Sequence, residues 1–113
     1  MADTNIVVVS GRLGNDPEPV KGEARLVKFH IACNRGYFDK EEKWVEKTNW
    51  LPTVVTGKSG DACMDYLRKG SPVLVHGNLE YRSWETEEGK KMVTYQVMTT
   101  SVQFLGGRSN DKE

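Results

Sequence analysis

Residues 58–70, KSGDACMDYLRKG, decide the fold because they carry a helical pattern in a chain that otherwise reads as strands. Ser59 is a suitable N-cap, and Asp61 suits the first turn of a helix that begins there. The basic pair at 68–69 suits the last turn, and Gly70 supplies the C-terminal stop. The segment therefore predicts one short helix near the middle of the sequence.

Strand-like segments flank this helix on both sides. Val27, Phe29 and Ile31 alternate with polar residues, which predicts a strand with one face inward. Strands are expected at 5–14, 25–34, 49–57, 71–84 and 92–105, with a turn at 15–23, a long hairpin arm at 35–49 and a hairpin turn at 86–91. Five strands with a helix between the third and fourth form the plan of the OB-fold, an all-β Greek-key barrel. Its core is expected to include Phe29, Tyr66 and Phe104.

The third strand raises a question, because NWLPTVVTGK at 49–58 contains a proline. Proline has no N–H to donate and is excluded from the middle of a sheet. Alternation places Trp50, Pro52, Val54 and Thr56 on one face. We expect Pro52 to lie at an open edge or a bulge, where a barrel presents its ligand groove, with Trp50 as an exposed platform rather than a core residue.

The composition fits one domain with one core. The chain has 113 residues and a net charge of zero, from 16 basic and 16 acidic residues, so bulk electrostatics neither announces nor excludes a nucleic-acid partner. No apolar run approaches the roughly 20 residues of a membrane span, and the N-terminus lacks the pattern of a signal peptide. We expect a soluble intracellular protein with Cys33 and Cys63 as free thiols and without a cofactor.

The sequence contains no arrangement of residues typical of an active site or a metal site. His30 and His76 lie in different strands, and neither has other ligands at metal-binding spacing. The glycine-containing stretches at 11–16 and 55–60 lack the spacing of a phosphate-binding loop. The sequence therefore predicts a binding protein rather than an enzyme.

Aromatic residues beside basic ones are the strongest functional signal. Single-stranded nucleic acid stacks its bases on flat rings, at about 1–3 kcal/mol per base, while cations follow its phosphates. Trp44 and Phe38 are as compatible with packing the barrel or steadying the hairpin arm as with stacking bases. The candidate nucleic-acid-binding residues are Tyr37, Trp50, Tyr81 and Trp84 among the aromatics, and Arg12, Lys28, Arg35, Lys47, Lys58 and Arg82 among the cations.

Three blocks resemble one known family. They are SGRLGNDPE at 10–18, YLRKGSPVLVHGNLEYRSW at 66–84 and QFLGGR at 103–108. In this order they are similar to the N-terminal domain of bacterial-type, homotetrameric single-stranded DNA-binding proteins, over residues 5–108. The resemblance implies an OB-fold that binds single-stranded DNA largely without sequence preference during replication, recombination and repair.

The resemblance also assigns site residues by position. The stacking tryptophans of the family fall on Trp50 and Trp84, and a third aromatic position falls on Tyr37. The chain departs from the family pattern at Thr56, where an aromatic residue is frequent, and at Pro52, Glu80 and Ser83, where basic residues are common. These changes remove stacking area and positive charge, which implies weaker or more salt-sensitive binding.

The resemblance implies a homo-oligomer, expected to be a tetramer. A small barrel also leaves open sheet edges, and the apolar segment at 5–10 is suited to pairing with its copy across a two-fold axis. We expect residues 1–108 to form the domain and residues 109–113 a short tail. Family members generally continue into a flexible linker and an acidic tip that recruits replication and repair proteins. This chain stops at GGRSNDKE, which fits either a shortened chain or a minimal branch such as a phage-encoded one, so these partners are expected only with a longer C-terminus.

Alternative functions remain open from the sequence. A primosome-type protein with the same fold would act mainly through protein assembly, but such proteins typically lack the stacking tryptophans. A module that binds RNA or oligosaccharide would share the fold. A nuclease would need clustered carboxylates, and the sequence shows none. The expected location is the cytoplasm, on the nucleoid, of a bacterium or in a phage-infected cell.

Overall fold

The computed structural model describes residues 2–20, 22 and 25–106. Within these residues the chain forms six strands and one helix. In chain order they are β1 (Val7–Leu13), β2 (Glu18–Pro19), β3 (Leu26–Phe38), β4 (Trp44–Thr56), α1 (Gly57–Tyr66), β5 (Pro72–Glu85) and β6 (Lys91–Phe104). The five long strands and the helix lie where the sequence predicts them. The short strand β2, which pairs with β3, lies in the stretch expected to be only a turn.

The long strands close into a barrel. Their order is β1-β5-β6-β4-β3, and an additional pairing between β1 and β3 completes the circuit. β4 and β6 run parallel over three residues, whereas the other pairs are antiparallel. At the β1–β3 contact Gly11 lies so close to the Ala32 carbonyl that a side chain would not fit. This closed five-stranded barrel, with its helix between β4 and β5, confirms the predicted OB-fold.

Alternating apolar residues fill the barrel. Phe29 and Ile31 of β3, Val55 of β4, and Val73 and Val75 of β5 are all 0–1% exposed. Their polar neighbours in sequence face outward, as the alternation predicts. The helix closes one end of this core, where Cys63 and Leu67 are also buried.

Two residues assigned to the core are not in it. Tyr66 is 73% exposed and Phe104 is 38% exposed, so that prediction was wrong for both and right for Phe29. The two rings instead lie side by side at the surface, with centroids 6.2 Å apart. The stripe of α1 that contains Cys63 faces the barrel, and Tyr66 lies beside this stripe rather than on it.

The predicted ends of the helix also need correction. Its N-cap is Thr56 rather than Ser59, without a side-chain cap, and the helix ends at Tyr66. β4 runs directly into α1 through Gly57, whose φ of 65° favours glycine. Arg68 lies beyond the last turn, yet its guanidinium still donates to the Met64 and Leu67 carbonyls at 3.2 and 2.7 Å. Gly70, with a φ of 93°, belongs to the turn that follows.

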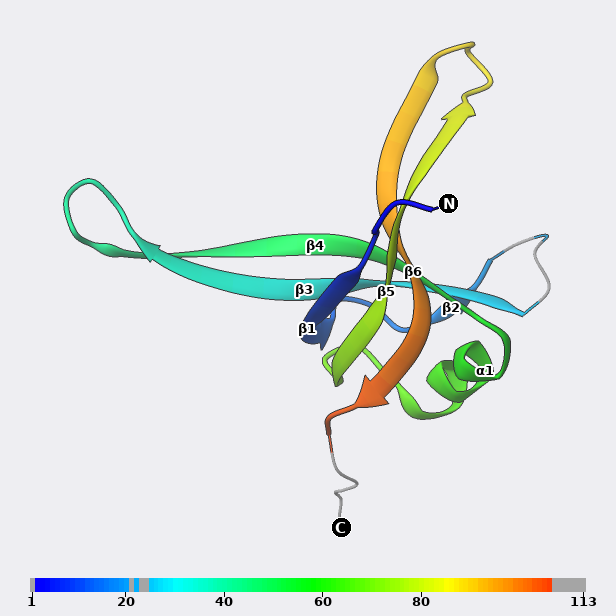
Figure 1. Cartoon of the computed structure of the whole chain (residues 1–113), viewed down its shortest axis with the longest axis horizontal. Coiled ribbons are helices and arrows are strands. Elements are labelled where there is room, and N and C mark those ends of the chain that lie inside the picture. Colours follow the sequence, from blue (N-terminus) through cyan, green and yellow to red (C-terminus); the bar gives the residue numbers. More distant parts are fainter. Residues whose placement is uncertain (1, 21, 23–24, 107–113) are drawn as a thin grey trace.

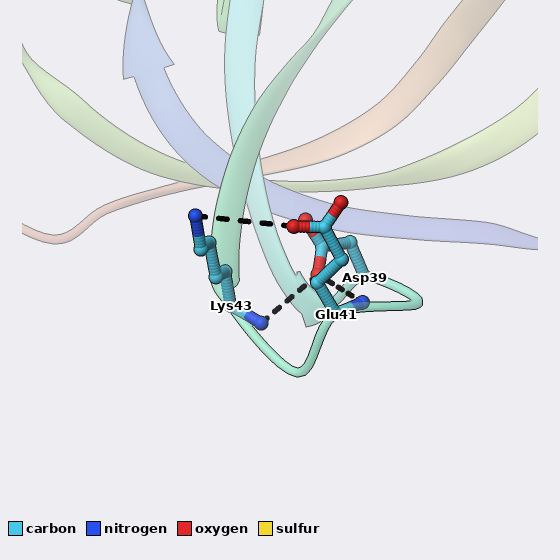
Figure 2. Close-up of polar contacts among 3 residues, drawn as sticks. All are labelled: Asp39, Glu41 and Lys43. Atoms are coloured by element: carbon cyan, nitrogen blue, oxygen red, sulfur yellow. Dashed lines mark hydrogen bonds and ion pairs between the residues drawn. The ribbon is translucent and has the colours of Figure 1, made fainter.

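Two long hairpins project from the barrel in different directions (Figure 1). One is the outer part of β3 and β4, and the other is the outer part of β5 and β6. A compact turn closes the first at its tip, where one carboxylate oxygen of Asp39 accepts the backbone N–H groups of Glu41 and Lys43, both at 2.9 Å (Figure 2). The β3–β4 ladder extends as far as this turn, and its last pair is Phe38 opposite Trp44.

No helix in the described part of the chain is long and apolar enough to cross a membrane. The tail predicted for residues 109–113 lies outside the described residues.

Candidate nucleic-acid interface

Pro52 lies where β4 loses its second partner strand. Within the described residues β4 pairs with β3 along its whole length, with Pro52 opposite His30, but with β6 only from Thr53 onward. The backbone of His30 turns away from β4, because its N–H donates to Asn15 and its carbonyl accepts the N–H of Gly14. Opposite residues in such a ladder either exchange both bonds or neither, so the Pro52 nitrogen also faces away from β3. The expected open edge is confirmed, and the missing N–H costs no ladder bond.

Trp50 stands on the outer wall of the barrel, 59% exposed, as the sequence predicts. It lies opposite Ala32, which in turn lies opposite Arg12 of β1, so all three side chains share one face. The indole rests on Gly14, where an added Cβ would be 2.5 Å from its Cζ3 atom. Trp50 is therefore an exposed ring in a fixed position, with a guanidinium two strands away.

A groove begins on the same face as Trp50. Pro52, two residues further along β4, lines this groove, which has a volume of about 630 Å³. One wall is the outer face of β3 and β4, and the other is the hairpin of β5 and β6. The wall residues that matter most are Lys28, His30 and Val54 on the first side, and Glu80, Arg82, Trp84 and Gln96 on the second.

Trp84 is the aromatic residue of the second wall. Its ring is 42% exposed, and the guanidinium carbon of Arg82 lies 5.5 Å from its centroid. This contact is a cation–π interaction that keeps the positive charge beside the ring. The groove thus contains Trp84 and the cations Lys28 and Arg82, and Pro52 at its margin lies two residues from Trp50.

Three candidates lie on the other face of the β3–β4 hairpin. Alternation and register place Arg35, Tyr37 and Lys47 on the face opposite that of Trp50. Arg35 and Lys47 are directly opposite each other, and like charges in that position repel. Neither forms an ion pair within the described residues, and Arg35 stacks at 5.5 Å over Tyr37. A phosphate between the two cations would relieve the repulsion.

The remaining candidates lie apart from the groove. Tyr81 faces the opposite side of its hairpin from Arg82 and packs edge-on against Tyr95, with centroids 5.6 Å apart. Lys58 is the second residue of α1 and is exposed. The Arg12 guanidinium donates to the Gly70 carbonyl at 2.8 Å, which directs its charge toward the β5 side of β1.

Trp44 and Phe38 pair with each other at the end of the β3–β4 hairpin. Their rings meet edge to face at 5.1 Å, and the Trp44 indole covers Gly36. Both remain more than half exposed. These contacts support the hairpin-steadying interpretation, and they leave part of each ring accessible.

Sequence reasoning missed the polar side of the groove. Gln96 and Thr94 lie opposite Glu80 and Arg82, and His30 lies opposite Pro52. Counting outward from Glu88 in the predicted turn would have paired Trp84 with Met92 and therefore Glu80 with Gln96. This register could have been read from the sequence and would have revealed the polar wall. The approach of β3 to β5, which brings the two walls together, could not.

The described residues show few features of catalytic chemistry. They contain no group of three or more His, Cys, Asp or Glu side chains able to hold a metal ion. Burial raises the pKa of the Cys63 thiol to about 11, which keeps it protonated and unreactive. His76 is exposed on β5, with Nδ1 3.3 Å from the Thr100 hydroxyl. A groove lined by an exposed aromatic ring and cations on an OB-fold is typical of the class of OB-fold proteins that bind nucleic acid.

Comparisons with known proteins narrow this class. The Single-strand binding protein family matches residues 4–105. The Single-stranded DNA-binding protein 2 of Chlorobaculum tepidum is 34% identical over 116 residues, covering all of this chain and 78% of the relative. The Single-stranded DNA-binding protein of Borreliella burgdorferi is 34% identical over 113 residues, covering 97% of this chain and 75% of the relative. A Plasmodium falciparum SSB complex with ssDNA has a TM-score of 0.82 at 26% identity, covering 93% and 97% of the two chains.

The chain belongs to the single-strand binding protein family. Members of this family are non-enzymatic DNA-binding proteins, which agrees with the prediction of a binding protein rather than an enzyme.

Proposed function

We propose that this protein binds single-stranded DNA largely without sequence preference and protects it during replication, recombination and repair. The observation that supports this most strongly is the groove between β3–β4 and β5–β6, with Trp50 beside it and Trp84 within it. Every base has a flat face, so two exposed rings joined by a groove accept any sequence. The family relationship supports the same ligand.

In the proposed complex, bases stack on Trp50 and Trp84 while phosphates follow the cations. Arg12 serves the strand near Trp50, and Lys28 and Arg82 serve it inside the groove. The strand would then pass to the opposite face of the β3–β4 hairpin, where Arg35 and Lys47 attract phosphate and Tyr37 offers a third ring. Tyr81 and Lys58 are assigned weaker contributions because they lie outside this path.

A direct test is a titration of the protein with dT oligomers, followed by quenching of tryptophan fluorescence. We expect saturable quenching by single strands and little by a duplex of the same length, because duplex bases have no free faces. Competition with RNA and with oligosaccharides separates the alternative ligands. Binding that is lost to RNA or sugar competitors, or an absence of quenching by dT, would contradict the proposal.

We also propose that the protein acts as a homo-oligomer, expected to be a tetramer, in the cytoplasm of a bacterial cell. β1 pairs with β5 on one side over Val7–Arg12, and with β3 only at Arg12 and Leu13. Within the described residues the other edge of β1 is therefore open near Val8. The side chains there are apolar and exposed, Val8 to 57% and Ile6 to 66%. An open apolar edge favours pairing with a second copy.

A primosome-type role through protein assembly is the second candidate. The exposed positions of Trp50 and Trp84 argue against it, because a protein that does not bind bases has no need to present both rings beside a basic groove.

A further inference from the structure

A carboxylate lies inside the groove proposed for DNA. Glu80 is half-buried, and its Oε1 accepts a 2.7 Å hydrogen bond from Nε2 of Gln96, which is 8% exposed. The two residues are directly opposite each other on β5 and β6, so the amide holds the carboxylate in place. This arrangement needs an explanation, because a negative charge in a DNA groove repels phosphate.

The described residues leave Glu80 only partly satisfied. No cation among them lies within ion-pair distance of its carboxylate, and Gln96 supplies its one side-chain hydrogen bond. A carboxylate accepts through two oxygens, so Oε2 remains available to a donor in the groove. A ligand that brings an N–H donor to this position would satisfy it, and a ligand that brings a carbonyl would not.

The bases of DNA differ in what they bring. Cytosine carries an amino group at ring position 4, where thymine carries a carbonyl, and glutamate accepts hydrogen bonds from the cytosine amino group. The two pyrimidines have similar rings and the same backbone, so stacking on Trp84 and phosphate contacts to Lys28 or Arg82 hardly distinguish them. The discrimination therefore falls on Glu80.

We propose that Glu80, oriented by Gln96, is a specificity-determining residue that biases the groove toward cytosine over thymine. This inference rests on the proposed binding of single-stranded DNA and refines it. Binding stays tolerant of sequence, because the stacking rings accept every base, but strands rich in cytosine gain a contact that oligo-dT lacks.

The test compares dC and dT oligomers of equal length on wild-type protein, Glu80→Gln and Glu88→Gln. Glutamine keeps the shape of Glu80 and can still accept the Gln96 bond, but its amide can donate to the thymine carbonyl as well as accept from cytosine. Glu88 lies exposed in the β5–β6 turn, so its variant removes the same charge outside the groove. We expect the ratio of dC to dT affinity to fall by about fivefold or more in Glu80→Gln, the usual scale for one good base contact, and to stay unchanged in Glu88→Gln.

Equal gains in dC and dT affinity in Glu80→Gln would overturn the inference and leave Glu80 as a repulsive charge only. A similar change of the ratio in both variants would also overturn it, because the effect would then come from net charge. A wild-type protein that binds neither oligomer would instead refute the proposed function itself, so the two failures are distinguishable.

Discussion

At the scale of single residues, Gly14 fixes the position of the Trp50 ring. An added Cβ would come within 2.5 Å of the indole, so Gly14→Ala should force the ring to move while leaving the barrel core untouched. We expect a loss of DNA affinity that approaches the contribution of one stacked base, roughly 1–3 kcal/mol, with little change in the free energy of unfolding. A double-mutant cycle checks this, because Gly14→Ala should have almost no further effect in a Trp50→Ala background. Additive losses would show that Gly14 acts elsewhere.

The two thiols should differ sharply in reactivity. Cys63 is fully buried with a pKa raised to about 11, whereas Cys33 is only half-buried. At pH 8 we expect a thiol reagent to label Cys33 in the folded protein and Cys63 only after unfolding. Labelling that persists in a Cys33→Ser variant under native conditions would contradict the buried position of Cys63.

Burial of Cys63 also makes stability depend on pH. Its folded pKa lies above the ordinary value of 9.0, so the protonated thiol is favoured in the folded state. The contribution is complete below about pH 9 and is lost as the pH rises from 9 toward 11. We expect the free energy of unfolding to fall more steeply over this range in the wild type than in Cys63→Ala. Parallel curves for the two proteins would contradict the shifted pKa.

The exposure of a residue and the strand face on which it lies were easier to predict from the sequence than its neighbours from distant strands. The exposure of Trp50 followed from its polar neighbours and from Pro52, and the structure confirms it. The separation of Tyr81 from Arg82 by strand alternation was also contained in the sequence. The groove was not, because it depends on how the β5–β6 hairpin crosses the outer face of β3 and β4.

At the scale of elements, strands were more predictable than the surroundings of the helix. Apolar alternation in β3 identifies its inner face, and Val27, Phe29 and Ile31 are all buried. In the helical segment, by contrast, Ala62 with Tyr66 and Cys63 with Leu67 form two i,i+4 pairs on adjacent stripes. The sequence alone does not tell which of the two stripes meets the barrel. This is why Tyr66 was placed in the core although Cys63 and Leu67 occupy it.

A second point at the scale of elements is a prediction about the open edge of β1. The N–H and carbonyl of Leu13 bond to Ser71 and Gly70 on the β5 side, so by alternation the N–H of Val9 points to β5 and that of Val8 to the open edge. Val8→Pro should therefore lower the mass of the oligomer measured by light scattering while the barrel remains folded. Val9→Pro, the matched control, removes a donor from the β1–β5 ladder and should destabilise the fold itself. An unchanged mass for Val8→Pro would exclude strand pairing through this edge.

At the scale of the whole molecule, the balance of charge limits the electrostatic share of binding. The net charge is zero, so positive charge is available only locally, along the groove and the β3–β4 hairpin. Each phosphate contact with a single strand contributes a slope of roughly −0.7 in a plot of log affinity against log salt. We expect a moderate slope and substantial binding that persists at high salt, because stacking does not depend on counterion release. Complete loss of dT binding at modest salt would show that stacking is not the main term.

The most direct test of the stacking role of Trp50 uses one variant, Trp50→Ala, with two readouts. We expect binding of a labelled dT oligomer to weaken by about 1–3 kcal/mol per site, with a much smaller change in the free energy of unfolding, because Trp50 lies on the outer wall. Trp44→Ala is the matched control, since it removes an exposed tryptophan from the same face of the hairpin but far from the groove, and its loss of affinity should be smaller. A loss of about 3–5 kcal/mol in stability with unchanged affinity for dT would instead make Trp50 a structural residue and contradict the stacking role on which the proposed function depends.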